Sequence, residues 1–248
     1  MSAAQTGPER APEAGTGAAL AVSTVIFALR PDEATGRMTL WTPLVRRIRQ
    51  PQQNLWALPG GWLPTDEELV TAAARTLGET TGLAPTYLEQ LYTFGDLGRS
   101  PGRRVISVVY WALVQSSEAE RAAVGENVRW FAADQLPALA FDHNRIVEYA
   151  LWRLRTKVEY ARIAHAFLGE TFTLAELREV HEAVLQRTLD PANFRRTVEA
   201  SGTVVPTGEL QSGTRHRPAR LYRYEASVDL ADRGPLGRER VTRTGEQQ

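Results

Sequence analysis

The chain has 248 residues, 43% of them hydrophobic, and its 29 basic residues balance 29 acidic ones. This composition is typical of a globular protein of one or two domains and excludes a fibrous chain. Because cysteine is absent, disulfides, thiolate metal sites and a cysteine nucleophile are excluded, which fits a cytoplasmic location. With no net charge, any affinity for nucleic acid must come from a local basic patch.

The first 142 residues predict a tail and one mixed α/β domain. Residues 1–17 lack the features of a signal peptide, and we expect a disordered tail. The apolar run 18–29 is too short to cross a membrane as a helix, and its β-branched residues favour a buried strand. Strand-like runs lie at 21–29, 38–45, 88–95, 104–114 and 128–133. A helix between the second and third runs completes a domain over 18–142.

That helix follows the pair Gly60-Gly61 and carries signals at both ends. Thr65 with Glu68 three residues later predicts a capping box, and Gly82 predicts a left-handed C-terminal cap. Positions 76, 79 and 80 share one face of such a helix, where three carboxylates would gather ligands for a divalent cation. The sequence instead has Thr76 and Thr80 around Glu79, and neutral hydroxyls compete poorly with water for magnesium. The pattern therefore predicts a helix without a metal site.

The same segment resembles the Nudix box, through the spacing of Gly61, Glu67, Arg75, Leu77, Glu79, Gly82 and Leu83. Nudix enzymes hydrolyse nucleoside diphosphates linked to another group, and the resemblance implies an α/β/α sandwich with a mixed sheet. It also implies an ion pair between Glu67 and Arg75, and metal-binding glutamates at positions 76, 79 and 80. Because two of those three are threonine, we expect no catalytic residue, no metal and no enzyme activity.

A lost metal site leaves room for a ligand pocket. Glycines let backbone amides approach a phosphate, and arginine can hold it through two hydrogen bonds. The candidate ligand-binding residues are Arg46, Arg47, Gly60, Gly61, Arg99 and Arg103, with Arg104 beside them. The loop around Arg99 is similar to that of ADP-ribose-type Nudix proteins, with Ser100 where aspartate is common. The alternative is that these arginines are solvated loop residues.

The remaining chain predicts a connecting helix and a second domain. Residues 143–168 have apolar residues at helical spacing, with a break near Thr156. Over 169–226, Thr173 and Glu176 predict a capping box, and Asp190 with Pro191 predicts the start of a second helix, over about 191–200. Two strands follow, an order typical of a winged helix-turn-helix. Residues 227–248 predict a second disordered tail.

The second helix and the wing predict a DNA-binding surface. Residues 191–224 contain six arginines and two glutamates, a net excess of four positive charges. At the start of a recognition helix, asparagine can read adenine and arginine can read guanine. The candidate DNA-binding residues are Thr173, Asn193, Arg195, Arg196, Arg215, Arg217 and Arg220. The alternatives are solvated arginines or a surface that binds protein.

Together, the degenerate box and the segments "FTLAELREVHEAVL", "LDPANFRR" and "RPARLYRY" closely resemble the Nudix-related transcriptional regulators of NAD metabolism, the NrtR family. The resemblance implies a homodimeric repressor of genes of NAD synthesis or salvage that binds a palindromic operator in double-stranded DNA. It implies that ADP-ribose, or a related NAD derivative, is the effector that releases the operator, with no cofactor and no membrane partner. Two rivals stay open: an active Nudix hydrolase with an accessory C-terminal domain, and a constitutive DNA-binding protein with an empty Nudix domain.

Overall fold

The computed structural model describes residues 17–85, 87–122, 127–158, 162–211 and 218–225. The predicted C-terminal tail, residues 1–16 of the predicted N-terminal tail, and the wing residues Arg215 and Arg217 lie outside the described residues. Within them, no helix is both long and apolar enough to span a membrane.

The N-terminal domain is built on one mixed sheet of seven strands in the described residues. These strands are β1 (Ala19–Pro31), β2 (Met38–Arg46), β3 (Trp56–Ala57), β4 (Gly60–Trp62), β5 (Tyr87–Phe94), β6 (Val105–Val114) and β7 (Val128–Ala132). The order is β3-β2-β1-β6-β5, with β4 paired to β1 and β7 to β2. β1 and β6 run parallel and the other pairs are antiparallel, so the predicted mixed sheet is confirmed.

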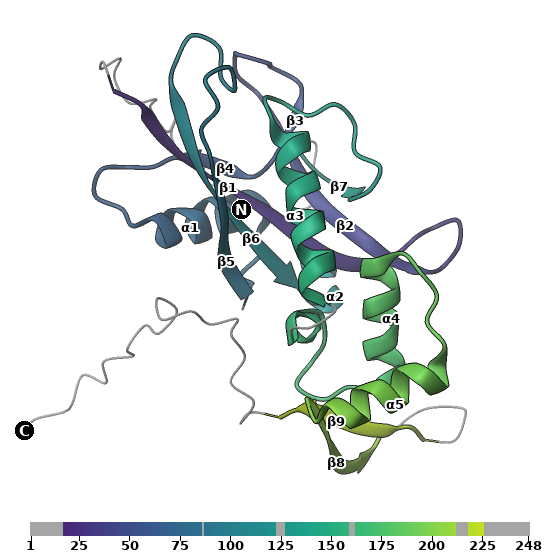
Figure 1. The fold of residues 1–248 in the computed structure, drawn as a ribbon. Coiled ribbons are helices and arrows are strands. Elements are labelled where there is room, and N and C mark those ends of the chain that lie inside the picture. The colour runs from purple at the N-terminus through teal and green to yellow at the C-terminus, as the bar shows by residue number, and fades with distance from the viewer. Residues whose placement is uncertain (1–16, 86, 123–126, 159–161, 212–217, 226–248) are drawn as a thin grey trace, which may run out of the picture.

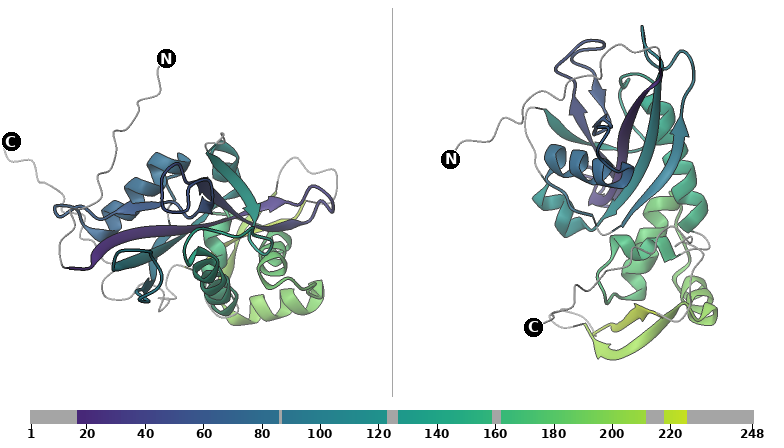
Figure 2. Two further views of the ribbon diagram at one scale, coloured as in Figure 1. Left: turned by 90° about the horizontal axis from the view of Figure 1, so that it is seen from above. Right: turned by 90° about the vertical axis from the view of Figure 1, so that its left-hand side faces the viewer.

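Helices cover both faces of the sheet, as Figure 2 shows. Along β1, Val25 and Phe27 belong to the core on the side of α3 (His143–Val158), whereas Ile26 and Ala28 belong to the core under α1 (Leu69–Thr81). Successive strand residues point to opposite faces, which explains why the central strands are apolar without interruption. The short α2 (Ser116–Arg121) lies on the same face as α1, where Ala119 shares a core with Leu77.

The start of α1 differs from the prediction. The helix begins at Leu69 with Glu68 as its N-cap residue, and no side chain caps it. Thr65 lies in the preceding turn, so the predicted capping box was wrong. Gly82 ends the helix as predicted, in the left-handed conformation with φ 70°.

The C-terminal domain lies at one end of the sheet, as seen in Figure 1. It consists of the 3₁₀ helix η1 (Arg162–Phe167), α4 (Leu174–Leu185), α5 (Pro191–Ser201) and the hairpin β8 (Val204–Leu210) and β9 (Arg220–Tyr224). The capping box of Thr173 and Glu176 is fully formed, and the Asp190 side chain accepts a hydrogen bond from the backbone N–H of Asn193. The predicted helix, turn, helix and hairpin are therefore present.

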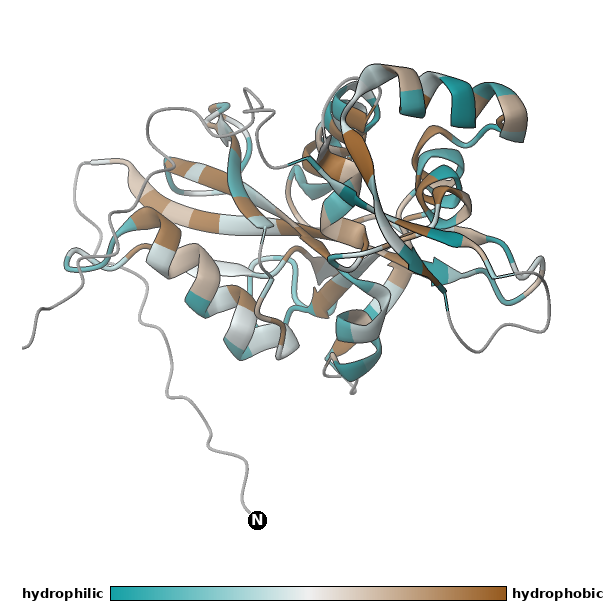
Figure 3. Cartoon of the chain, turned by 90° about the horizontal axis from the view of Figure 1, so that it is seen from below, coloured by the Kyte–Doolittle hydropathy of each residue, from teal (hydrophilic) through white to brown (hydrophobic). Residues whose placement is uncertain are grey.

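The predicted connecting helix is divided. α3 ends at Val158, and η1 starts at Arg162 after three residues outside the description. α3 packs against the sheet and forms its third layer, and Figure 3 shows the apolar residues gathered along the strands and the inner sides of the helices. One continuous core extends from Phe27 and Trp111 in the sheet through Leu154 in α3 to Val184 in α4 and Tyr222 in β9.

Candidate functional site

The Nudix-like segment keeps its ion pair. Arg75 Nε donates to Glu67 Oε1 over 2.9 Å, and Arg75 Nη2 donates to Glu67 Oε2 over 2.8 Å. Arg75 also reaches Glu79 Oε2 over 3.2 Å. The hydrogen bond from Arg75, helped by its charge, holds the pKa of Glu67 below its ordinary value. These bonds tie the loop before α1 to the middle of the helix.

The threonines on α1 are turned back onto the helix itself. Thr76 is buried, and its hydroxyl donates to the carbonyl oxygen of Ala72 over 2.8 Å. The hydroxyls of Thr80 and Thr81 donate to the carbonyls four residues earlier in the same way. Glu79 is the one carboxylate among positions 76, 79 and 80, and it is paired with Arg75, which it shares with Glu67. No group of three metal-ligating side chains occurs in the described residues, so this helix does not fit the divalent cation of the Nudix box.

Gly60 is required by a close backbone contact. It lies in β4 opposite Ser23 of β1, and a Cβ atom at this position would meet the carbonyl oxygen of Val22 at 2.3 Å. The Gly60-Gly61 pair forms the first two residues of the strand β4. The absence of a side chain at Gly60 therefore serves strand pairing, which gives no separate support to phosphate binding.

Two of the predicted ligand-binding arginines meet at the start of α3. Arg99 donates from Nε and Nη2 to the carboxylate of Asp142, both over 2.9 Å, and its side chain is only 6% exposed. The guanidinium of Arg47 lies over the ring of Phe141, 4.6 Å from its centroid. Arg99 is therefore engaged within the protein, whereas Arg47 is held at the edge of this cluster.

Between these two arginines lies His143, which is buried and neutral. Its Nδ1 accepts a hydrogen bond from the backbone N–H of Leu58 over 3.0 Å. The pKa of His143 is lowered to about 4, chiefly by burial; Asp142 opposes this shift, and Arg99 and Arg47 add to it. Gln52, Asn54 and Phe141 nearby have positive φ angles of 61°, 69° and 55°, although none is glycine. Such backbone strain is concentrated at functional sites in proteins.

The other candidates lie apart from this cluster. Arg103 stacks over Trp62, the last residue of β4, 5.4 Å from the ring centroid. Arg46 and Arg104 are exposed, and Arg104 donates to the carbonyl of Gly95. The predicted set is thus divided between the start of α3 and the β4 edge. Sequence reasoning missed Trp62, Phe141, Asp142 and His143, because their pairing across the chain leaves no local signal.

The second site is the outer surface of α5. Phe194 and Val198 pack against the core, and none of the residues of this helix is fully buried. Asn193, Arg195 and Arg196 are exposed. This face carries donors and positive charge in the open, which suits contacts to nucleic acid.

Hydrogen bonds order this surface before any ligand arrives. Arg196 Nη2 donates to Asn193 Oδ1 over 2.7 Å. Glu199 Oε1 accepts from Arg195 Nε and from the Tyr222 hydroxyl, each over 3.0 Å. Because Tyr222 lies in β9, Glu199 connects the helix to the wing.

The two remaining DNA-binding candidates in the described part of this domain differ in exposure. Arg220 is exposed at the start of β9. Thr173 is buried, and its hydroxyl is engaged in the cap of α4, which assigns it a structural role. His181 packs against the ring of Phe194 between α4 and α5, and burial lowers the pKa of His181 to about 4.

Comparison with known proteins identifies both halves. The Nudix domain family matches residues 21–150, and the "NrtR DNA-binding winged helix domain" matches residues 164–224. The chain is 34% identical over 186 residues to the "ADPR responsive transcriptional repressor NtrR" of Acinetobacter baylyi, covering 73% of this chain and 74% of that protein. The chain belongs to the NrtR family.

Solved structures of the NrtR family agree with this assignment. The structure of Shewanella oneidensis NrtR complexed with a 27mer DNA matches with a TM-score of 0.70 and 34% identity, covering 83% of this chain and 93% of that one. The Nudix half is also 32% identical over 111 residues to an ADP-ribose pyrophosphatase of Methanocaldococcus jannaschii, covering 44% of this chain and 66% of that enzyme. The predicted family and fold class are confirmed; the predicted domain boundaries and site residues stay predictions.

Proposed function

We propose that this protein is a ligand-responsive repressor that binds DNA through α5 and the wing and senses a pyrophosphate nucleotide through its Nudix domain. The observation that carries the proposal is the ordered basic face of α5 on a domain of the NrtR winged helix family. The similarity to a repressor described as ADPR responsive supports ADP-ribose, or a related NAD derivative, as the effector. Genes of NAD synthesis or salvage are the proposed targets, in the cytoplasm.

In this proposal α5 reads base edges. Asn193, Arg195 and Arg196 would enter the major groove, while Arg220, with Arg215 and Arg217, would contact phosphates or the minor groove. The excess of positive charge supplies attraction to any duplex, and the hydrogen-bonding side chains supply sequence preference. The protein would act as a homodimer on a palindromic operator, with its two recognition helices about 34 Å apart.

The N-terminal domain would bind the effector without hydrolysing it. Arg103 and Trp62 offer a cation and an aromatic face beside the β4 edge, and Arg47 offers a second cation near the start of α3. Guanidinium groups suit the pyrophosphate of the effector, and an indole ring suits its base. The loss of two of the three expected carboxylates supports binding without turnover, and no cofactor is needed.

The effector releases DNA by linkage. It weakens operator binding only if it prefers an arrangement whose recognition helices no longer match successive major grooves. A coupling of roughly 1–3 kcal/mol would lower operator affinity about 5- to 150-fold.

A gel shift tests this function. The probe is the promoter of an NAD-synthesis gene that neighbours the gene of this protein, with random DNA of equal length as the control. We expect tight binding to the promoter that ADP-ribose reverses. Equal affinity for both DNAs, or no effect of ADP-ribose, would contradict the proposal.

A second function is favoured by the similarity to an ADP-ribose pyrophosphatase. In this alternative the protein hydrolyses ADP-ribose-like substrates and the C-terminal domain is an accessory. Incubation with magnesium and ADP-ribose separates the two, because a hydrolase releases AMP and a sensor returns the ligand intact.

A further inference from the structure

A polar cluster joins the two domains at the C-terminal end of α4. Arg155, on α3, donates from Nη2 to Asp134 Oδ1 over 2.6 Å and from Nε to the carbonyl oxygen of Val184 over 3.1 Å. Gln186, directly after α4, donates from its amide to the other carboxylate oxygen of Asp134. Asp134 follows β7, so one carboxylate connects the sheet, α3 and α4.

The surroundings strengthen these bonds. The side chains of Arg155 and Asp134 are 33% and 28% exposed, so water screens their charges only in part. The geometry is specific, because the guanidinium bridges a carboxylate and a helix-terminal carbonyl that lacks a partner within its helix. Gln186 takes a left-handed conformation with φ 53°, which is uncommon for a residue other than glycine. That conformation directs the chain out of α4 at the point where the amide meets Asp134.

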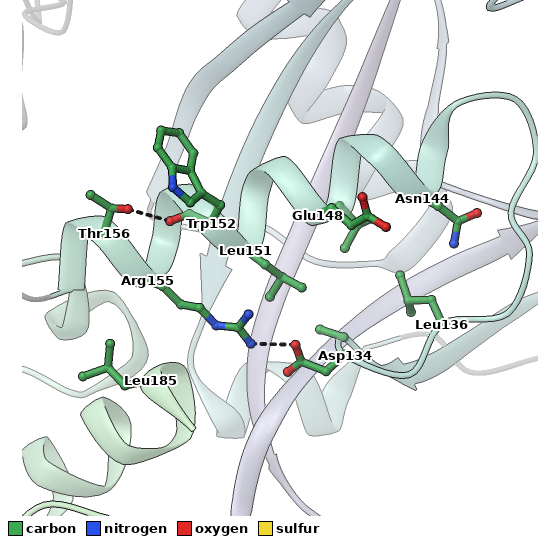
Figure 4. A pocket seen from close by; sticks show the side chains of 11 residues that line it. Asp134, Leu136, Asn144, Glu148, Leu151, Trp152, Arg155, Thr156 and Leu185 are labelled. Carbon is green, nitrogen blue, oxygen red and sulfur yellow. Dashed lines mark hydrogen bonds and ion pairs between the residues drawn. The ribbon is translucent and has the colours of Figure 1, made fainter. Parts of the chain in front are cut away.

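The inner side of α4 is packed into the core, but a pocket open to solvent borders each of its ends. A pocket of about 600 Å³ lies next to the cluster, between α3, the segment after β7 and Leu185 of α4. Figure 4 shows Arg155 and Asp134 joined by their ion pair in the lining of this pocket. A second pocket of about 290 Å³ lies at the other end, between the sheet and the start of α4, and includes Met38, Phe172 and Glu176. Because both pockets are open to solvent, side chains at the two ends of α4 can move without displacing core residues.

We propose that Asp134, Arg155 and Gln186 form a latch that fixes the orientation of the C-terminal domain on the N-terminal domain. The three residues are positioning residues that act on DNA binding through the angle of α4, and α5 follows α4. The latch closed as described holds α5 in the orientation that reads the operator. The link to the operator rests on the proposed function, whereas the link to domain orientation does not.

The first experiment measures orientation alone. Because the chain has no cysteine, the variants Thr71→Cys and Thr188→Cys place two spin labels on exposed positions, one in each domain. Pulsed electron paramagnetic resonance should give a narrow distance distribution with the latch intact and a broader one in Arg155→Gln. Arg153→Gln is the matched control, because it makes the same change on the opposite side of α3. Equal distributions in the three proteins would overturn the latch.

The second experiment measures the consequence for DNA. Asp134→Asn and Arg155→Gln should each weaken operator binding by roughly 3- to 30-fold, and the double variant should add little, because both break one unit. Calorimetry should give an ADP-ribose affinity that is equal to or higher than that of the unmodified protein in every variant, because the effector prefers the arrangement that the latch opposes. Retained binding also excludes misfolding of the N-terminal domain, and a lower affinity would contradict the coupling. Operator affinity unchanged in Arg155→Gln would refute the link. If the unmodified protein binds no operator, the proposed function fails while the distance measurement still decides the latch.

Discussion

Two helices, α1 and α5, are predicted from similar sequence signals but differ in whether their polar side chains are available to a ligand. Both end at a glycine in the left-handed conformation, and both have one apolar side. On α1 the hydroxyls are consumed by carbonyls of the same helix, and the one carboxylate of the metal face is paired with Arg75. On α5 the amide and guanidinium groups also bond within the helix, to one another and to Glu199, yet they stay exposed on its outer face. A helix can therefore bind a metal ion or DNA only through polar groups that the fold leaves exposed.

The largest effect should come from rebuilding a carboxylate on α1. Thr76→Glu places a charge where the native side chain is 4% exposed, so the free energy of unfolding should fall by roughly 2–5 kcal/mol. Thr76→Val, which keeps the shape, should cost less than about 1.5 kcal/mol. Chemical denaturation with and without magnesium measures both. If Thr76→Glu is as stable as the unmodified protein without magnesium, this face of α1 tolerates a charged side chain and the prediction is wrong.

The next effect concerns the outward face of α5. Arg195→Ala should weaken operator binding by about 10- to 150-fold, because the variant loses a guanidinium aimed at a base edge. ADP-ribose affinity should stay within a few-fold, since the pocket is elsewhere. Gel shifts and calorimetry run in parallel measure the two affinities. Loss of both in a folded variant would mean that α5 and the ligand pocket are one site.

Acid should lower the stability of both domains, because each contains a buried histidine. Because the folded-state pKa values of His143 and His181 are about 4 and the unfolded value is near 6.5, the unfolded chain binds more protons between these pH values. Stability is therefore complete above about pH 6.5 and is lost as the pH falls towards 4. Each histidine should contribute a loss of about 2 kcal/mol between pH 7 and 5.

Denaturation at the two pH values, repeated in His181→Gln, isolates one of these contributions. The variant should show a pH dependence about half as steep. An unchanged dependence would assign the acid sensitivity to other groups.

The smallest effect should come from Glu199. It holds Arg195 and Tyr222, and its negative charge faces the proposed DNA surface. Glu199→Gln should raise affinity for random DNA by about 2- to 5-fold while operator affinity rises less, because repulsion of phosphate is lost together with the positioning of Arg195. Anisotropy titrations at several salt concentrations on both DNAs give the ratio of operator affinity to random-DNA affinity, which we expect to fall. If this ratio is higher in Glu199→Gln than in the unmodified protein, Glu199 does not favour the operator.

The contrast between the helices also marks what the sequence could predict. The caps of α4 and α5 were predicted correctly because they depend on residues three positions apart, such as Thr173 with Glu176. The start of α1 was missed because Thr65 stays in the preceding turn and Glu68 itself takes the N-cap position. β3 and β4 were missed because strands of two or three residues exist only through their pairing with β2 and β1.

The functional sites show the same difference between local signals, which could be predicted, and tertiary contacts, which could not. The threonines of α1 could be read from the box spacing, and Asn193, Arg195 and Arg196 from the helix start. The partners Asp142 for Arg99 and Trp62 for Arg103 depend on tertiary contacts, which a single sequence does not encode locally. Thr173 was predicted to contact DNA from its place in the sequence, whereas the fold buries its side chain in the cap of α4.

The core that runs without interruption from Trp111 to Tyr222 has a consequence for how such proteins can be rearranged. Since neither half closes its own apolar interior, heating should give a single endotherm, and the fragment 164–224 expressed alone should be prone to aggregate. Grafting this DNA-binding half onto a foreign partner would therefore require α3 to travel with it. Residues on either side of the junction are therefore expected to change together.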